Sequence, residues 1–287
     1  MNVKKLTLGG KDFPEVLAHI PQPPPELYVA GAPLADLLQY PRVAVVGSRK
    51  VSTYGRAVTS QLAGELARAG VVIVSGLAIG VDALAHKAAL EAGGLTIAVL
   101  PSGLDRIYPG SHYQLALQII KQGGALVTEY PSGTTPYPSN FIARNRIASG
   151  LSDGLLITEA AQKSGSLHTA RFALEQGREV MAVPGNINSP TSAGTNNLIK
   201  SGATPVTQAT DVLYALDIQP APVTDHPAMF GTAQERQLLA LIAQGTCDGD
   251  ELLVASQLDV SLFNQTLTML EITGKVRPLG NNQWGVY

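Results

Sequence analysis

Four short segments of this chain carry residue types that could hold an anionic ligand. Gly47-Ser48-Arg49 ends an apolar run with a glycine-led turn and a cation, and Ser75–Asp82 (SGLAIGVD) places two glycines at a predicted helix start. Asn140–Gly154 carries two arginines and an asparagine beside a phenylalanine, and Thr158–Arg171 carries a lysine before a Ser-Gly-Ser turn. Backbone amides at helix N-termini and nearby cations are the groups that bind phosphates. The four segments therefore predict an anion site with one aromatic platform.

The glycine and serine turns also have a purely structural interpretation. Gly76 and Gly80 could simply form a tight turn, and Asp82 could be only a helix cap. A Ser-Gly-Ser turn is common in proteins of every function. The combination is more informative than its parts, because all four segments follow predicted strands on one edge of a sheet.

The two arginines of the third segment are also ambiguous. Arg144 and Arg146 lie two residues apart on a predicted helix and cannot both face one ligand. One of them is therefore left for a structural ion pair with Glu159 or Asp153.

The chain lacks the signatures of nucleotide enzymes and of the common hydrolases. The next glycine after Gly47 is Gly55, so neither a GxGxxG dinucleotide turn nor a GxxxxGK[ST] phosphate loop is present. We find no GxSxG elbow, no plausible Ser-His-Asp order and no metal-ligand spacing of histidines or carboxylates. Glu129 and Glu159 are the only acid–base candidates, and neither has a matched partner. We therefore predict a non-enzymatic protein without catalytic residues, metal or cofactor.

The segments fall where the strands of a parallel sheet would end. From residue 42 onward, apolar strands alternate with amphipathic helices, which is the pattern of right-handed strand–helix–strand units in an α/β fold. Open sheets of this kind bind ligands at the carboxyl ends of their strands. A helix is expected from about Thr53 to Ala69, after a Ser52/Thr53 cap. The expected strands are Val43–Gly47, Val71–Ser75, Leu95–Leu100, Ala125–Thr128, Gly154–Thr158, Val180–Val183 and Thr204–Thr207.

The sequence predicts four stretches of chain. Residues 1–41 are expected to form an extended, proline-rich lead-in, and residues 42–218 the sheet domain. Residues 219–231, rich in Pro and Ala without periodicity, read as a linker before a small domain at 232–287.

The small domain is predicted to be a winged helix that does not bind duplex DNA. Three short helices precede two strand-like pieces around Gly280-Asn281-Asn282. From Gln219 onward three cations face seven anions, a net charge of −4, and the third helix contains no Lys or Arg. Duplex affinity rests largely on phosphate neutralisation by these cations. We therefore expect a protein-contact or autoregulatory domain. Its expected elements are Ala233–Ala243, Asp250–Leu258, Ser261–Thr273, Lys275–Leu279 and Gln283–Tyr287.

Composition indicates a cytoplasmic protein with no membrane partner. The chain has 287 residues, 45% of them hydrophobic, which is enough to bury a full core. Its apolar runs are far shorter than the roughly 20 residues that span a bilayer, and no apolar stretch follows the charged start as in a secretory signal. The single cysteine, Cys247, agrees with a reducing compartment.

A longer set of motifs runs in unbroken order from about Tyr28 to Leu216. It consists of VAVVGSRKVSTYG, VSGLAIGVDALAHKAAL, AVLPSGLDRIYPGSH, LVTEYPSG with FIARNRIASGLSDGLLITEA, and KSGSLHTARFALEQGREVMAVPG with SAGTNNLIKSGA. These stretches resemble the DNA-processing protein A family (DprA, also called Smf). The resemblance implies an extended Rossmann-like, doubly wound, mostly parallel sheet followed by a small winged-helix domain. It also implies a protein that binds single-stranded DNA, protects incoming DNA and helps load a RecA-type recombinase during natural transformation, with a homodimer expected.

Carried onto this chain, the resemblance implies a DNA-binding pocket. Arg49 would contact phosphate, Phe141 would stack on a base, and further cations would come from the third and fourth segments. An electrostatic groove with an aromatic residue suits sequence-independent binding of single strands. The implied DNA-binding residues are Gly47, Ser48, Arg49, Ser75, Gly76, Gly80, Phe141, Arg144, Asn145, Arg146, Lys163, Ser164, Gly165 and Ser166.

An enzyme is the alternative. The same Rossmann variant is similar to that of the lysine-decarboxylase-like phosphoribohydrolases, which cleave nucleoside monophosphates with an Arg and a Glu near a PGGxGTxxE turn. Here the comparable stretch reads KSGSLHTARFALE, which lacks the paired glycines. Hydrolysis would need Arg171 and Glu175 as the acting pair.

Overall fold

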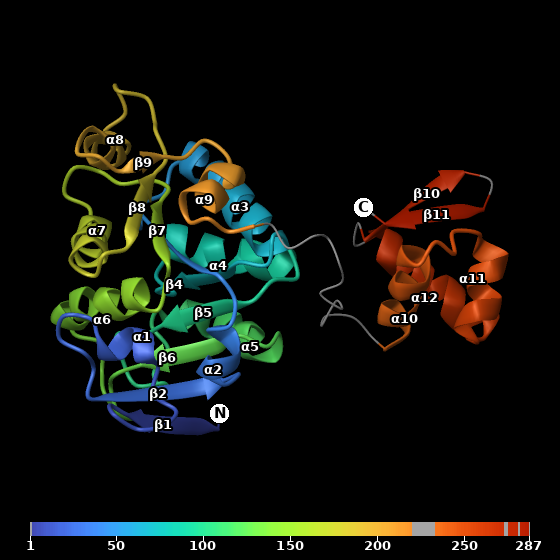
Figure 1. Ribbon diagram of the computed structural model, residues 1–287, viewed down its shortest axis with the longest axis horizontal. Coiled ribbons are helices and arrows are strands. Elements are labelled where there is room, and N and C mark those ends of the chain that lie inside the picture. The colour runs from blue at the N-terminus through green and yellow to red at the C-terminus, as the bar shows by residue number, and fades with distance from the viewer. Residues whose placement is uncertain (1, 220–232, 273–274, 281, 287) are drawn as a thin grey trace. The chain divides into compact units, whose positions relative to one another are not determined.

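A computed structural model gives the fold (Figure 1) and describes residues 2–219, 233–272, 275–280 and 282–286. The chain forms two compact units, Met1–Val223 and Thr224–Tyr287. Nearly all of the predicted linker lies outside the described residues.

The first unit is a mixed, mostly parallel nine-stranded sheet covered by helices on both faces. Its strands are β1 (Val3–Thr7), β2 (Glu26–Gly31), β3 (Arg42–Val46), β4 (Val72–Ser75), β5 (Thr96–Val99), β6 (Ala125–Thr128), β7 (Gly154–Ile157), β8 (Glu179–Ala182) and β9 (Thr204–Pro205). Its helices are α1 (Glu15–Ala18), α2 (Leu34–Leu37), α3 (Thr53–Arg68), α4 (Val81–Glu91), a 3₁₀ turn (Gly110–His112), α5 (Tyr113–Lys121), α6 (Pro138–Gly150), α7 (Ser166–Glu175), α8 (Ala193–Lys200) and α9 (Ala209–Ala215).

The sheet is doubly wound around β3. The strand order is β1-β2-β6-β5-β4-β3-β7-β8-β9, and the neighbours from β6 to β9 pair in parallel. The chain therefore winds outward from β3 through β4, β5 and β6, and then returns to the other side of β3 for β7, β8 and β9. The carboxyl ends of β3 and β7 flank the point where this order reverses, which is where open α/β sheets form a ligand crevice.

Successive side chains along a buried strand point to opposite faces of the sheet, and different helices pack on each face. Val43 and Val45 of β3 share one core with residues of α3, α4 and α9. Ala44 and Val46 share a different core with residues of α7, and α6 packs on the same face against neighbouring strands. Figure 1 shows α6 and α7 on one side of the sheet and α3, α4 and α9 on the other. Both faces of the sheet are therefore buried under helices, which is why the sequences of its parallel strands are almost continuously apolar.

The parallel strands and the first long helix confirm the sequence prediction. Each predicted strand is present within one or two residues of its expected bounds. The Ser52 side chain caps α3, because its hydroxyl accepts a hydrogen bond from the Gly55 amide at 3.0 Å.

The expectation of an extended lead-in over residues 1–41 is wrong. These residues add two strands, β1 and β2, to the sheet, and they also form two short helices, α1 and α2. β2 pairs antiparallel with β6, and β1 pairs antiparallel with β2. Leu27 and Val29 of β2 are buried in one core, whereas Ala30 faces another. A strand that joins antiparallel at an edge needs no crossover helix, so it lacks the strand–helix rhythm that identified the others.

The second unit contains α10 (Ala233–Ala243), α11 (Gly249–Ser256), α12 (Val260–Ile272), β10 (Val276–Gly280) and β11 (Gln283–Val286). Its small core includes Leu238, Phe263, Leu267 and Leu270, and Trp284 packs against this core. β10 and β11 pair antiparallel as the predicted hairpin. Three helices and a hairpin are the parts of a winged helix, and α12 has no cationic side chain.

Within the parts of the chain that the structure describes, no helix is both long enough and apolar enough to cross a membrane.

Candidate functional site

A groove of about 840 Å³ lies beyond the carboxyl ends of β3, β4 and β7 in the first unit. Segments as far apart in sequence as Val46 and Thr191 meet here because the sheet order reverses at β3. The predicted residues that line the groove are Gly47, Ser48, Arg49, Gly76, Phe141, Arg144, Asn145, Lys163, Ser164, Gly165 and Ser166.

The turn after β3 is clamped from two sides. The Ser48 amide donates to the Glu159 carbonyl at 2.8 Å, and the Ser48 carbonyl accepts from the Val81 amide at 3.2 Å. Gly80 has a φ of +89°, and a Cβ there would lie 2.2 Å from the Ser48 carbonyl oxygen. Only glycine fits this position. The clamp holds the exposed Arg49 side chain at the groove.

One face of α6 forms the adjoining wall. Phe141, Arg144, Asn145 and Ala148 line the groove, and their spacing of three, four and seven residues places them on a single helical face. Arg146 projects to a different side of the same helix.

A buried cation and a buried anion lie at the floor of the groove. Arg144 is only 3% exposed, and its Nη1 donates to the Val99 carbonyl. Asp82 Oδ2 accepts from the Gly76 amide at 3.1 Å and from the Ala78 amide at 3.4 Å. Burial raises the pKa of Asp82 and lowers that of Arg144, and each charge opposes the other's shift. The interpretation of Asp82 as a helix cap is wrong, because α4 has no side-chain cap and Asp82 instead binds amides of the loop before the helix.

Two aromatic rings and a cation form a cluster on the groove wall. The Arg49 guanidinium carbon lies 4.9 Å from the Phe141 ring centroid, a cation–π contact. The Tyr108 and Phe141 ring centroids are 5.4 Å apart with an interplanar angle of 77°. Tyr108 lines the groove and was missed by the sequence prediction. It follows β5, so the same strand-end rule applied to the loop after β5 could have found it.

The fourth segment brings a helix N-terminus to the groove. Gly165 is the N-cap of α7 and supplies no capping side chain. The Ser164 and Ser166 hydroxyl oxygens are 2.8 Å apart, and Lys163 is exposed beside them. The amides of Ser166, Leu167 and His168 already donate to Ser164 and Gly165, so it is the positive end of the ten-residue helix that favours an anion at this position.

Two family models match this chain, one over each of its two units. The model of the family described as DNA recombination-mediator protein A matches residues 4–217, and a DprA winged helix domain model matches residues 218–282. The chain belongs to the DNA recombination-mediator protein A family. The second match covers α10, α11, α12 and β10 of the C-terminal unit and ends just before β11.

Two relatives of known name show how far this family resemblance extends. Protein Smf of Escherichia coli is 49% identical over 200 residues, which cover 70% of this chain and 54% of that protein. DNA processing protein DprA of Bacillus subtilis is 40% identical over 214 residues, which cover 75% of this chain and 71% of that protein. The chain thus spans about half the length of the E. coli relative.

Solved family structures share the fold of the first unit. The X-ray structure of DprA from Streptococcus pneumoniae is similar with a TM-score of 0.68 and 41% identity, over 74% of this chain and 73% of that one. A Helicobacter pylori DprA structure is similar with a TM-score of 0.66 and 35% identity, over 75% of this chain and 95% of that one. That structure is described as giving insight into the single-stranded DNA binding mode of the H. pylori protein.

Three predicted site residues of this family member do not line the groove. The Ser75 hydroxyl is buried and donates to the Val45 carbonyl at 2.6 Å, so it links two strands. Gly80 packs closely against the backbone of Ser48 and Arg49 but does not itself line the groove.

Arg146 is the third, and its guanidinium is bound to Glu129 by contacts of 3.2 and 2.6 Å. Their side chains are only 10% and 12% exposed. One arginine of α6 is thus in a structural pair, as the spacing indicated, but the expected partners were wrong. Asp153 binds Arg42, and Glu159 accepts hydrogen bonds from Ser52.

The two acid–base candidates are both held by structural partners. Glu159 is 1% exposed, and its carboxylate accepts from the Ser52 amide at 3.0 Å and from the Ser52 hydroxyl, so it helps to fix the start of α3. Glu129 is paired with Arg146. The match to a recombination-mediator family agrees with the prediction of a non-enzymatic protein.

The pair that hydrolysis would require lies outside the groove lining. Arg171 and Glu175 form an exposed i,i+4 ion pair of 3.2 Å on α7, with side chains 67% and 45% exposed. Such a pair is solvated on both partners and is an ordinary surface contact. The geometry therefore does not support the phosphoribohydrolase alternative.

The described residues contain no group of three or more His, Cys, Asp or Glu side chains placed to hold a metal ion. His86 is fully buried, and its Nδ1 lies 2.7 Å from the Thr96 hydroxyl. Burial lowers its pKa to about 3, so the ring is neutral.

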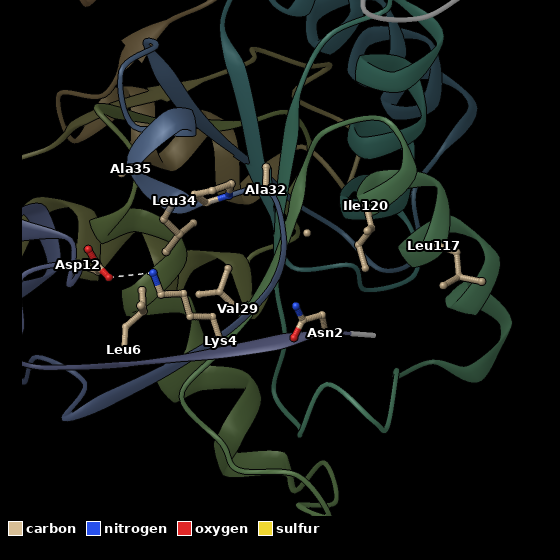
Figure 2. Close-up of a pocket in the computed structure, with 12 residues that line it drawn as sticks. Asn2, Lys4, Leu6, Asp12, Val29, Ala32, Leu34, Ala35, Leu117 and Ile120 are labelled. Carbon is tan, nitrogen blue, oxygen red and sulfur yellow. Dashed lines mark hydrogen bonds and ion pairs between the residues drawn. The ribbon is translucent and has the colours of Figure 1, made fainter.

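A second hollow of about 580 Å³ lies beside β1 and β2, away from the predicted residues. Figure 2 shows Leu6, Val29 and Leu34 lining it, with Lys4 reaching to Asp12. The Lys4 Nζ and Asp12 Oδ2 atoms are 2.8 Å apart, so the charge of this lysine is paired. The hollow is mostly apolar and has none of the groove's clustered cations.

Proposed function

We propose that this family member binds single-stranded DNA in the groove at the carboxyl ends of β3, β4 and β7. The observation that carries the proposal is the gathering of exposed cations, a helix N-terminus and aromatic rings in one groove. Its likeness to the H. pylori protein, whose structure is described by a single-stranded DNA binding mode, supports the same ligand class.

Each group of the groove has a role that follows from its chemistry. Arg49 and Lys163 are exposed and contact phosphates, while the positive end of α7 favours a further phosphate group. Phe141 offers a ring face to a base. Arg144 is buried beneath them, where the neighbouring Asp82 carboxylate offsets its charge.

Single strands are preferred because stacking on these rings requires an unpaired base. The winged-helix unit adds little to duplex affinity, since α12 has no cation with which to neutralise phosphates. It fits a protein-contact or autoregulatory role better than a groove-reading one.

A titration of single-stranded and duplex DNA of equal length, followed by fluorescence anisotropy across salt concentrations, tests the proposal. We expect the single strand to bind more tightly at every salt concentration. Lys163→Ala should weaken binding, whereas Lys200→Ala, which removes an exposed lysine of α8 outside the groove lining, should not. Equal affinity for duplex at moderate salt would contradict the proposal.

We also propose that the bound protein protects incoming DNA in the cytoplasm during natural transformation and helps to load a RecA-type recombinase onto it. The family match to recombination mediators supports this role. Nuclease-protection and recombinase-loading assays on coated single strands test it, and the role fails if the protein neither slows digestion nor speeds loading. A homodimer is proposed on the family resemblance, and light scattering in solution tests it.

A further inference from the structure

Tyr108 carries the more exposed aromatic surface of the groove. Its side chain is 46% exposed, whereas Phe141 is half-buried and has Arg49 against its ring. Tyr108 lies in the loop between β5 and the 3₁₀ turn and lines the same groove as Phe141. An exposed, neutral aromatic ring among cations is suited to a base and not to a phosphate.

The angle between the two rings limits how a strand can use them. Their planes are inclined by 77° with centroids 5.4 Å apart. A base that stacks on one ring therefore stands almost perpendicular to the other ring. Neighbouring bases in an ordinary stacked strand are nearly parallel, so they cannot occupy both rings while they remain stacked on each other.

We propose that Tyr108 is a second base platform and that the groove separates two bases of the strand, one on Tyr108 and one on Phe141. This inference rests on the proposed function of single-stranded DNA binding. It gives a geometric reason for the preference for single strands that we expect, because a base pair inside a duplex cannot present its faces to two crossed rings. The Arg49 guanidinium beside Phe141 then lies close to the phosphates that flank the separated bases.

The test compares variants on two strands of equal length, oligo(dT) and a strand of abasic sites, which carry the same phosphates. Tyr108→Leu removes the ring and keeps an apolar side chain, while Tyr108→Phe and Tyr108→Trp keep a ring. Tyr137→Leu is the matched control, because Tyr137 is 61% exposed on the neighbouring segment but does not line the groove.

We expect Tyr108→Leu to weaken oligo(dT) binding about tenfold, within the range for loss of one base–aromatic stack. Its affinity for the abasic strand and the slope of log affinity against log salt should both stay unchanged, since no charge is removed. Tyr108→Phe, Tyr108→Trp and Tyr137→Leu should bind both strands like wild type. Wild-type protein should also bind oligo(dT) more tightly than oligo(dA), because adenines are costlier to unstack.

Two outcomes would overturn the inference. Tyr108→Leu could bind oligo(dT) like wild type, or it could lose equal affinity for both strands, which would show a role in holding the fold or the phosphates. If wild-type protein binds neither strand, the proposed function itself has failed, and that result is distinct from both.

Discussion

Replacing Arg146 by methionine should destabilise the protein without weakening its DNA affinity. The Arg146–Glu129 pair is double, with N···O contacts of 3.2 and 2.6 Å, and both side chains are about nine-tenths buried. The substitution leaves the Glu129 carboxylate in a poorly solvated position. Neighbouring Tyr130 reports the same environment, since burial first and the Glu129 charge second raise its pKa to about 12.

Removing one partner of a buried ion pair costs about 3–5 kcal/mol, because the remaining charge is stranded. We expect about 3 kcal/mol here, which at a urea m-value of about 2–3 kcal/mol/M moves the unfolding midpoint down by about 1 M. Adding Glu129→Gln to the Arg146→Met variant should restore part of this loss, since it neutralises the stranded charge.

Urea unfolding followed by far-UV circular dichroism measures the effect. Tryptophan fluorescence does not serve, because the single tryptophan, Trp284, belongs to the C-terminal unit. Lys163→Met is the matched control, since it removes an exposed charge of the groove. It should change stability by less than about 0.5 kcal/mol and weaken single-strand binding. If Arg146→Met keeps wild-type stability, or if its folded form loses DNA affinity, then the assignment of Arg146 to the core is wrong.

Three further predictions address binding and stability. Arg49→Ala should weaken binding to every sequence about equally and lower the slope of log affinity against log salt by about 0.7, the value for one phosphate contact on a single strand; an unchanged slope would exclude that contact. Truncation after Ile218 should keep single-strand affinity within about tenfold of the full chain, and a larger loss from a folded fragment would place the winged helix in the DNA site. His86 has a folded pKa of about 3 against an ordinary 6.5, so between those values the unfolded state binds more protons. The free energy of unfolding should therefore fall as pH falls through this window, by up to about 1.4 kcal/mol per pH unit, and His86→Gln should remove that part of the slope in urea midpoints; a variant with the wild-type slope would refute it.

The parallel core could be predicted from sequence because its signal is local. Runs such as Val43–Val46 are apolar at every position, which a strand buried on both faces requires, and this run is followed by a helix that begins at the Ser52 cap. β2 was missed because its pairing with β6 is antiparallel and non-local, and four prolines at positions 21 and 23–25 dominate the sequence just before it.

The candidate site could be predicted to the level of segments but not of side chains. Strand ends mark which turns gather at the switch point, and this rule brought Gly47, Phe141 and Lys163 to one groove. Helical spacing showed that Arg144 and Arg146 must diverge. It could not show which of them faces the ligand, because that depends on which face of α6 packs on the sheet.

Partner choice was decided by tertiary structure alone. Glu129 lies seventeen residues before Arg146, and only the fold of the β6–α6 connection brings its carboxylate to the guanidinium. Tyr108 comes from the loop after β5 and Phe141 from helix α6 after β6, so no spacing in the sequence encodes the 77° angle between their rings. Local patterns determined the elements and the edge of the sheet where binding groups collect, whereas long-range packing determined which charges are neutralised in the core and which remain exposed to a ligand.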